Sequence, residues 1–332
     1  MKIYTPDYYR KFHCIASDCP DSCCKEWEVD VDGDTAAFYR GLNGDLGDRL
    51  RQVLRDTADG TVMTIENGRC PMWRQDGLCR IQAELGHDAL CFTCRQFPRL
   101  SHDYGDFIEH GLELSCPEAA RLILSAEHSY TCREVPGGDA PEYDTGIMAI
   151  LLKSREEVLR FLDRTDLPLN RALAAVLLFA HEVQAALDGG EYLPLDASAC
   201  LTLAVKHAGS PDWDTFRDFF KGLEILTPQW PSRLDAPRSP APWNETHLAL
   251  ARYGIWRYWL QAVSDFDLVC RVKLIISMCL LVNGLGGDTV QTAQLFSKEI
   301  ENDADNVDAI LDGAYSSPAF TDVNLLSLLL CP

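Results

Sequence analysis

The chain has 332 residues, of which 47% are hydrophobic and 24% charged, a composition that excludes disordered and fibrous classes. This length exceeds what a single hydrophobic core usually organises, so we expect two folded units. The formal net charge of −20 repels phosphate backbones and anionic lipid headgroups. Nucleic acid and membranes are therefore excluded as partners, whereas a protein segment that presents lysines is favoured.

The amino-terminal residues are aromatic and charged and lack the apolar run of a signal peptide. The most apolar later stretches, 172–180 and 274–282, are about half as long as a membrane span. We therefore expect a cytoplasmic protein. In that reducing compartment, grouped cysteines serve as metal ligands or reactive thiols more often than as disulfides.

Residues 1–132 alternate short apolar pieces with turns rich in Gly, Asp and Cys, which predicts a loop-rich domain held together by its cysteines. The pattern in this part predicts helices at 34–40, 47–57, 82–90 and 116–127, and strands at 62–65 and 107–114. A segment dense in Pro and Gly follows and predicts a linker over residues 133–146.

Residues 147–332 predict an all-α domain that binds the substrate or a partner. Helical periodicity covers 147–164, 170–187, 212–226, 245–264, 266–283, 289–301 and 307–314, and a Pro-rich loop at 227–243 separates two helical groups. The fold class is therefore mainly α, with a metal-organised N-terminal domain followed by a helical bundle. Four single cysteines in apolar surroundings are expected to fill this core: Cys200, Cys270, Cys279 and Cys331.

The remaining ten of the fourteen cysteines precede residue 133. They run as Cys14-x4-Cys19-x3-Cys23-Cys24, then Cys70, Cys79, Cys91-x2-Cys94, Cys116 and Cys132. Thiolates two to four residues apart can converge on one soft metal from a single turn, and distant pairs complete the shell when the chain folds. The spacing predicts a metal site, but zinc and iron-sulfur clusters both take four thiolates, so it does not choose between them.

Four motifs surround these cysteines: Tyr8-Tyr9-x2-Phe12-x-Cys14, Asp76-Gly77-Leu78-Cys79, Cys94-Arg95-x-Phe97-Pro98-Arg99 and Ser115-Cys116-Pro117-Glu118. Together they resemble the flagellin lysine-N-methylase family, part of a wider cysteine-rich group described as a zinc- or iron-chelating domain. The resemblance covers residues 4–125.

The resemblance implies an enzyme that transfers methyl groups from S-adenosylmethionine to lysine side chains of flagellin or a similar surface protein. It also implies an iron-sulfur cluster, of the 4Fe-4S type, with zinc as the alternative. The positions that match the family's cysteines are Cys14, Cys19, Cys23, Cys24, Cys70, Cys79, Cys94 and Cys116.

Direct methyl transfer requires a neutral amine, so a base or a desolvated site is expected beside the lysine. Candidate bases in the cysteine-rich part are Glu109, Glu118 and His110, together with Glu113 and His102. Candidates to bind the carboxylate of S-adenosylmethionine are Arg95, Arg99 and Arg121. No glycine loop joins a strand to a helix, which disfavours a Rossmann-type methyltransferase.

Two other functions remain open. A non-enzymatic carrier of iron or zinc is expected to release its metal readily to a competitor, whereas the enzyme is expected to retain it and bind S-adenosylmethionine. A thiol redox enzyme that uses Cys91 and Cys94, or Cys23 and Cys24, requires a low thiol pKa.

Overall fold

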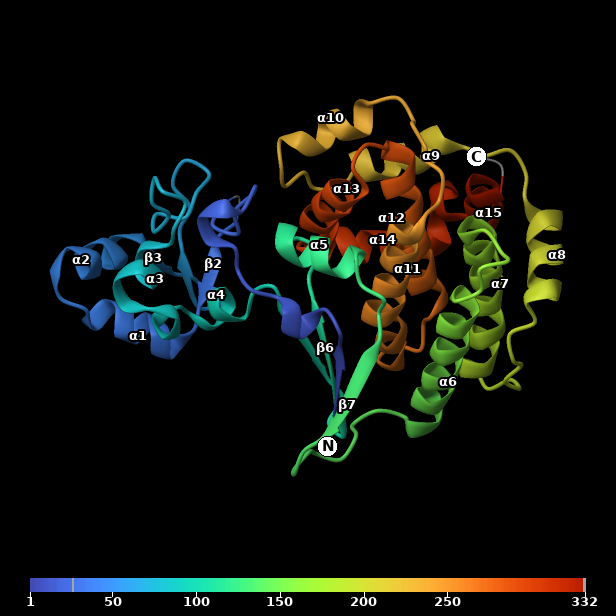
Figure 1. Ribbon diagram of the computed structural model, residues 1–332, viewed down its shortest axis with the longest axis horizontal. Coiled ribbons are helices and arrows are strands. Elements are labelled where there is room, and N and C mark those ends of the chain that lie inside the picture. Colours follow the sequence, from blue (N-terminus) through green and yellow to red (C-terminus); the bar gives the residue numbers. More distant parts are fainter. Residues whose placement is uncertain (26, 331–332) are drawn as a thin grey trace.

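The computed structural model describes residues 1–25 and 27–330, and shows a mainly α protein with a small and a large lobe (Figure 1). Cys331 and its expected core role lie outside the described residues. The small lobe stands to one side in Figure 1 and carries α1 to α4, whereas the remaining helices gather in the large lobe.

A four-stranded sheet anchors the small lobe to the large one. Its strands are β1 (Lys2–Pro6), β5 (Arg99–Asp103), β6 (Phe107–Leu112) and β7 (Tyr130–Glu134), in the order β5-β6-β1-β7. Strand β1 runs parallel to β6 and antiparallel to β7. The small lobe is thus an insertion between β1 and β5.

The small lobe has its own hydrophobic cluster, which includes Val29, Tyr39, Leu50 and Met72. It contains an antiparallel three-stranded sheet with the order β2-β4-β3. The elements of this lobe are β2 (Val29–Val31), α1 (Gly33–Gly41), α2 (Gly44–Val53), β3 (Leu54–Asp56), β4 (Thr61–Met63), α3 (Arg80–Leu85) and α4 (Phe92–Gln96), with a 3-10 turn, η3, at His87–Ala89.

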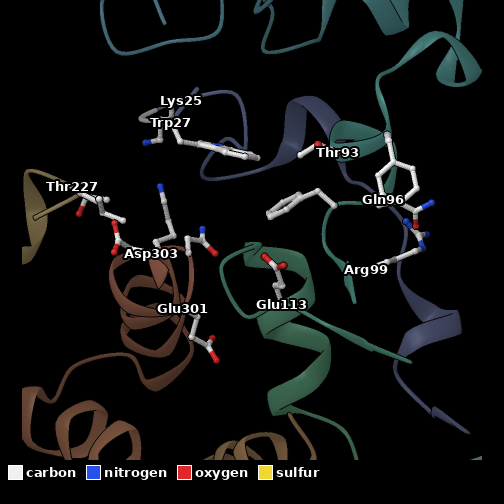
Figure 2. A pocket seen from close by; sticks show the side chains of 14 residues that line it. Lys25, Trp27, Thr93, Gln96, Arg99, Glu113, Thr227, Glu301 and Asp303 are labelled. Carbon is white, nitrogen blue, oxygen red and sulfur yellow. The ribbon is translucent and has the colours of Figure 1, made fainter. Parts of the chain in front are cut away.

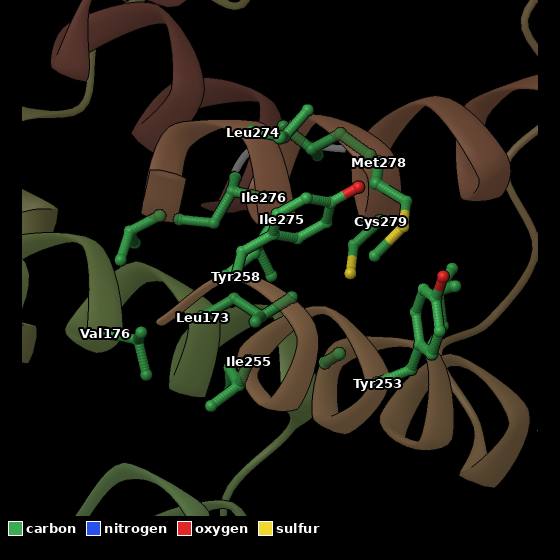
Figure 3. Packing of buried hydrophobic residues seen from close by; sticks show 14 of the residues in the cluster. Leu173, Val176, Tyr253, Ile255, Tyr258, Leu274, Ile275, Ile276, Met278 and Cys279 are labelled. Atoms are coloured by element: carbon green, nitrogen blue, oxygen red, sulfur yellow. The ribbon is translucent and has the colours of Figure 1, made fainter. Parts of the chain in front are cut away.

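The large lobe packs its helices around α12 (Val269–Leu285), every residue of which is buried (Figure 3). A mostly apolar helix belongs in the middle of a core, and the two buried cations of α12, Arg271 and Lys273, pair with Asp265 and Asp322. Its companions are α5 (Pro117–Leu124), α6 (Thr145–Leu162), α7 (Leu169–Leu187), α8 (Ala197–His207), α9 (Trp213–Lys221), α10 (Gln229–Asp235), α11 (Glu245–Tyr258), α13 (Thr289–Phe296), α14 (Ala304–Ser316) and α15 (Asp322–Leu330).

Short irregular helices complete the chain. The 3-10 segments η1 (Tyr9–Lys11) and η2 (Ala16–Asp18) precede the small lobe, and η4 (Trp259–Val263) continues α11. A π-helical turn, η5 (Ser297–Glu301), extends α13, and a last 3-10 turn, η6 (Pro318–Phe320), leads to α15. Turns of the π type frequently occur at functional sites.

Three predicted helices of the N-terminal part end earlier in the structure, and the one at 116–127 stops at Leu124. The one at 47–57 stops at Val53, because Leu54–Asp56 pairs with Thr61–Met63 as a strand of a hairpin. The one at 82–90 is interrupted at Gly86, whose φ of 89° lies in the left-handed region and closes α3.

The Pro-rich segment 227–243 is not entirely a loop, because Gln229–Asp235 forms α10. Pro228 and Pro231 stand before and in its first turn, where a missing backbone N–H costs nothing. The predicted helices of the C-terminal part are confirmed with shifted ends, and Cys200, Cys270 and Cys279 are buried there as expected.

The two hydrophobic clusters do not meet at the predicted linker, residues 133–146. Residues of β6 and α5, such as Phe107, Leu112 and Ile123, belong to the same cluster as the C-terminal helices. The division into units of 1–132 and 147–332 stays a prediction. In the part of the chain that the structure describes, no helix combines the length and the apolar character needed to cross a bilayer.

Candidate functional site

The cysteines of the N-terminal part occupy turns and helix starts. Cys79, Cys91 and Cys116 are the N-cap residues of α3, α4 and α5. Free backbone N–H groups at a helix start stabilise a thiolate. Burial raises the pKa of Cys116 to about 12, and the backbone N–H groups of Ala119 and Glu118 oppose that rise.

Of the eight cysteines that match the family pattern, all but Cys14 interact electrostatically with Cys23, and Cys14 interacts with Cys19. Their charged forms repel one another: Cys23 acts on Cys19, Cys70, Cys79, Cys94 and Cys116, Cys14 acts on Cys19, and Cys24 acts on Cys23 and Cys94. All cysteines in the described part of the chain are free thiols. The fold therefore brings together thiols from segments as distant in sequence as Cys14 and Cys116.

Cys91, which lies outside the family pattern, joins the same group. A hydrogen bond with Cys94 lowers the pKa of Cys91 to about 7 and raises that of Cys94. A low thiol pKa is one requirement of the redox alternative, but α4 follows the 3-10 turn η3 rather than a strand. Cys132 is exposed on β7 and pairs with Tyr4 of β1.

Within residues 1–25 and 27–330, no three His, Cys, Asp or Glu side chains are arranged to hold one metal ion. The donor set nevertheless suits an iron-sulfur cluster chemically, because that group takes thiolates and is tuned by nearby N–H donors. The helix starts at Cys79, Cys91 and Cys116 supply such donors.

A cavity of about 540 Å³ is lined by residues that neighbour two of the cysteines in the sequence (Figure 2). This volume is in the range of small-molecule sites. The small lobe contributes Lys25, which follows Cys24, and Thr93, which precedes Cys94. The cavity is lined by Lys25, Trp27, Phe92, Thr93, Gln96, Phe97, Arg99, Glu113, Leu226, Thr227, Lys298, Glu301, Asn302 and Asp303.

Glu301, at the end of the π turn, is held by a buried network. The hydroxyl of Tyr258 donates to its carboxylate over 2.6 Å, and that of Tyr253 does so over 3.0 and 3.1 Å. Arg257 Nε lies 3.2 Å from the same carboxylate, whose side chain is only 1% exposed. Both tyrosines and the arginine come from α11, so this helix fixes the carboxylate at the cavity wall.

Glu113 follows β6 and extends into the cavity, on the side opposite Trp27 and Thr93 (Figure 2). Its Oε2 accepts a hydrogen bond of 3.2 Å from the hydroxyl of Ser115. Burial raises the pKa of the Glu113 carboxyl, the Arg257 guanidinium opposes that rise, and the Glu301 carboxylate adds to it.

Three of the predicted base candidates, Glu109, Glu118 and His110, lie outside this cavity. Glu109 forms a buried bidentate pair with Arg155. Glu118 pairs with Arg121 on the surface of α5. His110 stacks on Tyr9, with ring centroids 4.9 Å apart. Each of these side chains has a structural partner, whereas Glu113, another of the predicted candidates, lines the cavity.

Of the other predicted residues, Arg99 and Glu113 line the cavity. Arg95 donates to the carbonyl of Asp88, and Arg121 is bound by Glu118. His102 lines a second cavity of about 930 Å³, and burial lowers its pKa to about 4. Glu301 carried no sequence signal, because it reads as the polar end of an amphipathic helix.

Three curated proteins match the chain significantly. It is 32% identical over 138 residues to the flagellar biosynthetic protein FliU of Salmonella muenchen, a match that covers 38% of this chain and 78% of FliU. The lysine-N-methylases of Salmonella typhimurium and Salmonella choleraesuis are also 32% identical over 138 residues, but the match covers 33% of each.

No family model and no solved structure matches the chain. The match to FliU covers more than two thirds of that protein, and the motifs around the cysteines indicate the same relatives. The chain therefore belongs to the flagellin lysine-N-methylase family.

Proposed function

We propose that this protein is a protein-lysine N-methyltransferase that uses S-adenosylmethionine as methyl donor and depends on a cysteine-ligated iron-sulfur cluster. The name of two relatives, lysine-N-methylase, supports the reaction. The observation that carries the proposal is the cavity of about 540 Å³, because the sequence neighbours of Cys24 and Cys94 line it together with the buried carboxylates of Glu113 and Glu301.

The residues proposed to hold the cluster are Cys14, Cys19, Cys23, Cys24, Cys70, Cys79, Cys94 and Cys116, from which four ligands are drawn. A bound 4Fe-4S cluster supplies either a redox centre or a rigid anchor for the surrounding loops. Burial keeps the thiols of Cys70 and Cys116 protonated at neutral pH without metal, with pKa values of about 11 and 12. Binding is therefore expected to release protons.

The donor and the acceptor meet in the same cavity in this proposal. Arg99 lies at its wall, with its guanidinium 5.1 Å above the ring of Phe12, and is proposed to bind the carboxylate of S-adenosylmethionine. The aromatic residues Trp27, Phe92 and Phe97 suit a sulfonium or ammonium group, because the face of an aromatic ring attracts cations.

The acceptor is proposed to be flagellin or another protein that presents lysines. One relative is named a flagellar biosynthetic protein. A net charge of −20 raises the encounter rate with a basic surface. The free thiols of the described residues support an action in the cytoplasm, where thiols stay reduced.

Anaerobic purification, followed by iron and sulfide analysis, tests the cluster. Incubation with methyl-labelled S-adenosylmethionine and flagellin tests the reaction, with mass spectrometry of acceptor peptides as readout. The variant Cys23→Ser is expected to lose iron and activity, whereas Cys132→Ser on β7 is the matched control and is expected to keep both. Metal that is bound after purification but readily lost to a chelator, together with no binding of S-adenosylmethionine and no methyl transfer, would instead favour the metal carrier.

A further inference from the structure

We propose that Glu113 is the catalytic base that takes the proton of the acceptor lysine, and that the cavity walls beside it hold the lysine's alkyl chain. This inference rests on the proposed function. It adds to that function the place where the acceptor amine binds and the group that makes it nucleophilic.

Among the carboxylates of the cavity, Glu113 has the most unused capacity to accept hydrogen bonds. In the described part of the chain, its carboxylate accepts a single side-chain hydrogen bond, from Ser115 to Oε2. Glu301 is bound by two tyrosines and Arg257. Asp303 accepts from the backbone N–H of Asn306 and caps α14. Oε1 of Glu113 is therefore the oxygen available to a ligand.

The cavity also offers an apolar path to this oxygen. Trp27 and Phe92 are 38% and 57% exposed, so their rings offer apolar surface to a ligand in the cavity. The indole Nε1 of Trp27 donates to the carbonyl of Cys23 over 2.9 Å, which fixes the ring beside the cysteines. A lysine side chain fits this site, because its methylenes need apolar contact and its ammonium group needs an acceptor.

The charges around Glu113 come from several elements. Arg257 on α11 lowers its pKa and Glu301 on the π turn raises it, while burial outweighs both. Lys25 and Lys298 form ion pairs with Asp21, at 2.7 and 3.1 Å. The other charged residues of the cavity are Arg99 and Asp303. The net effect raises the pKa of the Glu113 carboxyl toward neutral pH, and a general base is most effective when its pKa is near the working pH.

The step balances as a proton transfer followed by a displacement. The Glu113 carboxylate takes one proton from the lysine ammonium, which leaves a neutral amine with a lone pair. That lone pair forms a bond to the methyl carbon of the sulfonium donor. The carbon–sulfur bond breaks, its electron pair returns to sulfur, and the products are a methylated ammonium, a thioether and protonated Glu113.

Calorimetry with two peptides tests the binding part without any chemistry. One peptide carries a single lysine and the other carries norleucine at that position. Wild-type protein is expected to bind the lysine peptide at least tenfold more tightly than the norleucine peptide. Glu113→Gln is expected to abolish that difference, Glu113→Asp to keep part of it, and Glu118→Gln, the same change in a carboxylate bound by Arg121 outside the cavity, to leave it intact.

The pH dependence of methyl transfer tests the catalytic part. In Glu113→Gln the rate is expected to fall at neutral pH by about a hundredfold or more. It should then keep rising toward about pH 10, where lysine deprotonates unaided. An unchanged rate and pH profile would overturn the inference and leave the methyltransferase in place. Lysine-selective binding that requires Glu113, without any methyl transfer, would support the acceptor site and refute the proposed reaction.

Discussion

Glu109 and Arg155 join the four-stranded sheet to α6 through two hydrogen bonds of 2.6 and 2.8 Å. Their side chains are 2% and 7% exposed. Arg155 also lies 4.4 Å above the ring of Trp256, which stacks on Tyr130 of β7. The pair is thus enclosed by aromatic rings, and neither charge has access to water.

Removing one charge from this pair is expected to destabilise the protein strongly. Glu109→Gln leaves the guanidinium of Arg155 buried without an opposite charge, at a cost of about 3–5 kcal/mol in the free energy of unfolding. Glu156→Gln is the control, since Glu156 pairs with Arg160 on the same helix but both are exposed, and it should cost at most about 1 kcal/mol. Urea denaturation compares the two; equal losses would contradict the argument.

Buried histidines give the stability a defined pH dependence. Burial lowers the pKa of both His102 and His128 to about 4, from an ordinary value of 6.5. Between pH 6.5 and 4 the unfolded chain therefore binds more protons than the folded one, so acidification favours unfolding. The loss should be on the order of 2 kcal/mol per imidazole by pH 5.

Thermal melts from pH 7 to pH 5 measure this effect. The replacement His128→Gln should flatten part of the slope, whereas the same change at the exposed His13 should leave it as it is. An identical slope in wild type and His128→Gln would show that this imidazole does not control the acid sensitivity.

At the scale of elements, the contact between α9 and α12 depends on a glycine. A Cβ atom at Gly284 would lie 2.2 Å from the ring of Trp213, which begins α9. Gly284→Ala is therefore expected to cost about 1–3 kcal/mol through overpacking. Gly33→Ala, at the start of α1 with nothing within 4 Å, should be close to neutral. Denaturation midpoints of the two variants settle the comparison, and a stable Gly284→Ala would refute it.

Some helices and strands could be predicted from local sequence patterns and others could not. The helix α6 was predictable because its apolar residues recur on one face, and α7 because its long apolar run is followed by Asp188 and two glycines. The helix α15 was missed, since its run of leucines has no polar face, and so was β1, whose five residues include Pro6. Short strands in a mixed sheet carry little local signal, because their partners lie far away in sequence.

In the candidate site, the cysteines could be predicted from the sequence, whereas the arrangement of the cavity glutamates could not. Cysteine spacing is local, so the grouping of Cys14, Cys19 and Cys23 could be read directly. The pairing of Glu113 with Glu301 at one cavity depends on how β6 and the π turn meet in the folded chain. Nothing near either glutamate in the sequence indicates that meeting, and the buried arginines and tyrosines that hold Glu301 are visible only in three dimensions.

For the whole molecule, the two hydrophobic clusters predict unequal dependence on metal. The cluster of the small lobe is minor and includes Cys70 and Cys91, whereas the large cluster includes none of the proposed ligands among its fully buried members. Removal of the proposed iron-sulfur cluster is expected to speed hydrogen exchange over residues 23–97 and to leave α6, α7 and α12 protected.

Hydrogen-exchange mass spectrometry of the iron-loaded and chelated protein measures this difference. The control is Cys132→Ser, loaded and chelated in the same way, which should give the same two patterns. Uniform protection in both states would mean that the small lobe is stable without its metal. Uniform loss would mean that both lobes unfold together.

Strand β1 has a consequence for how the chain folds as it is made. It lies between β6 and β7, and its parallel partner begins at Phe107, about a hundred residues later. A ribosome that adds roughly 5–20 residues per second needs on the order of 5–20 seconds to reach that partner. During this interval β1 has no partner strand on either edge, while the whole of the inserted small lobe leaves the ribosome. Insertion of the proposed iron-sulfur cluster into the small lobe can therefore precede closure of the sheet, and until closure both edges of β1 are open to pairing with other chains.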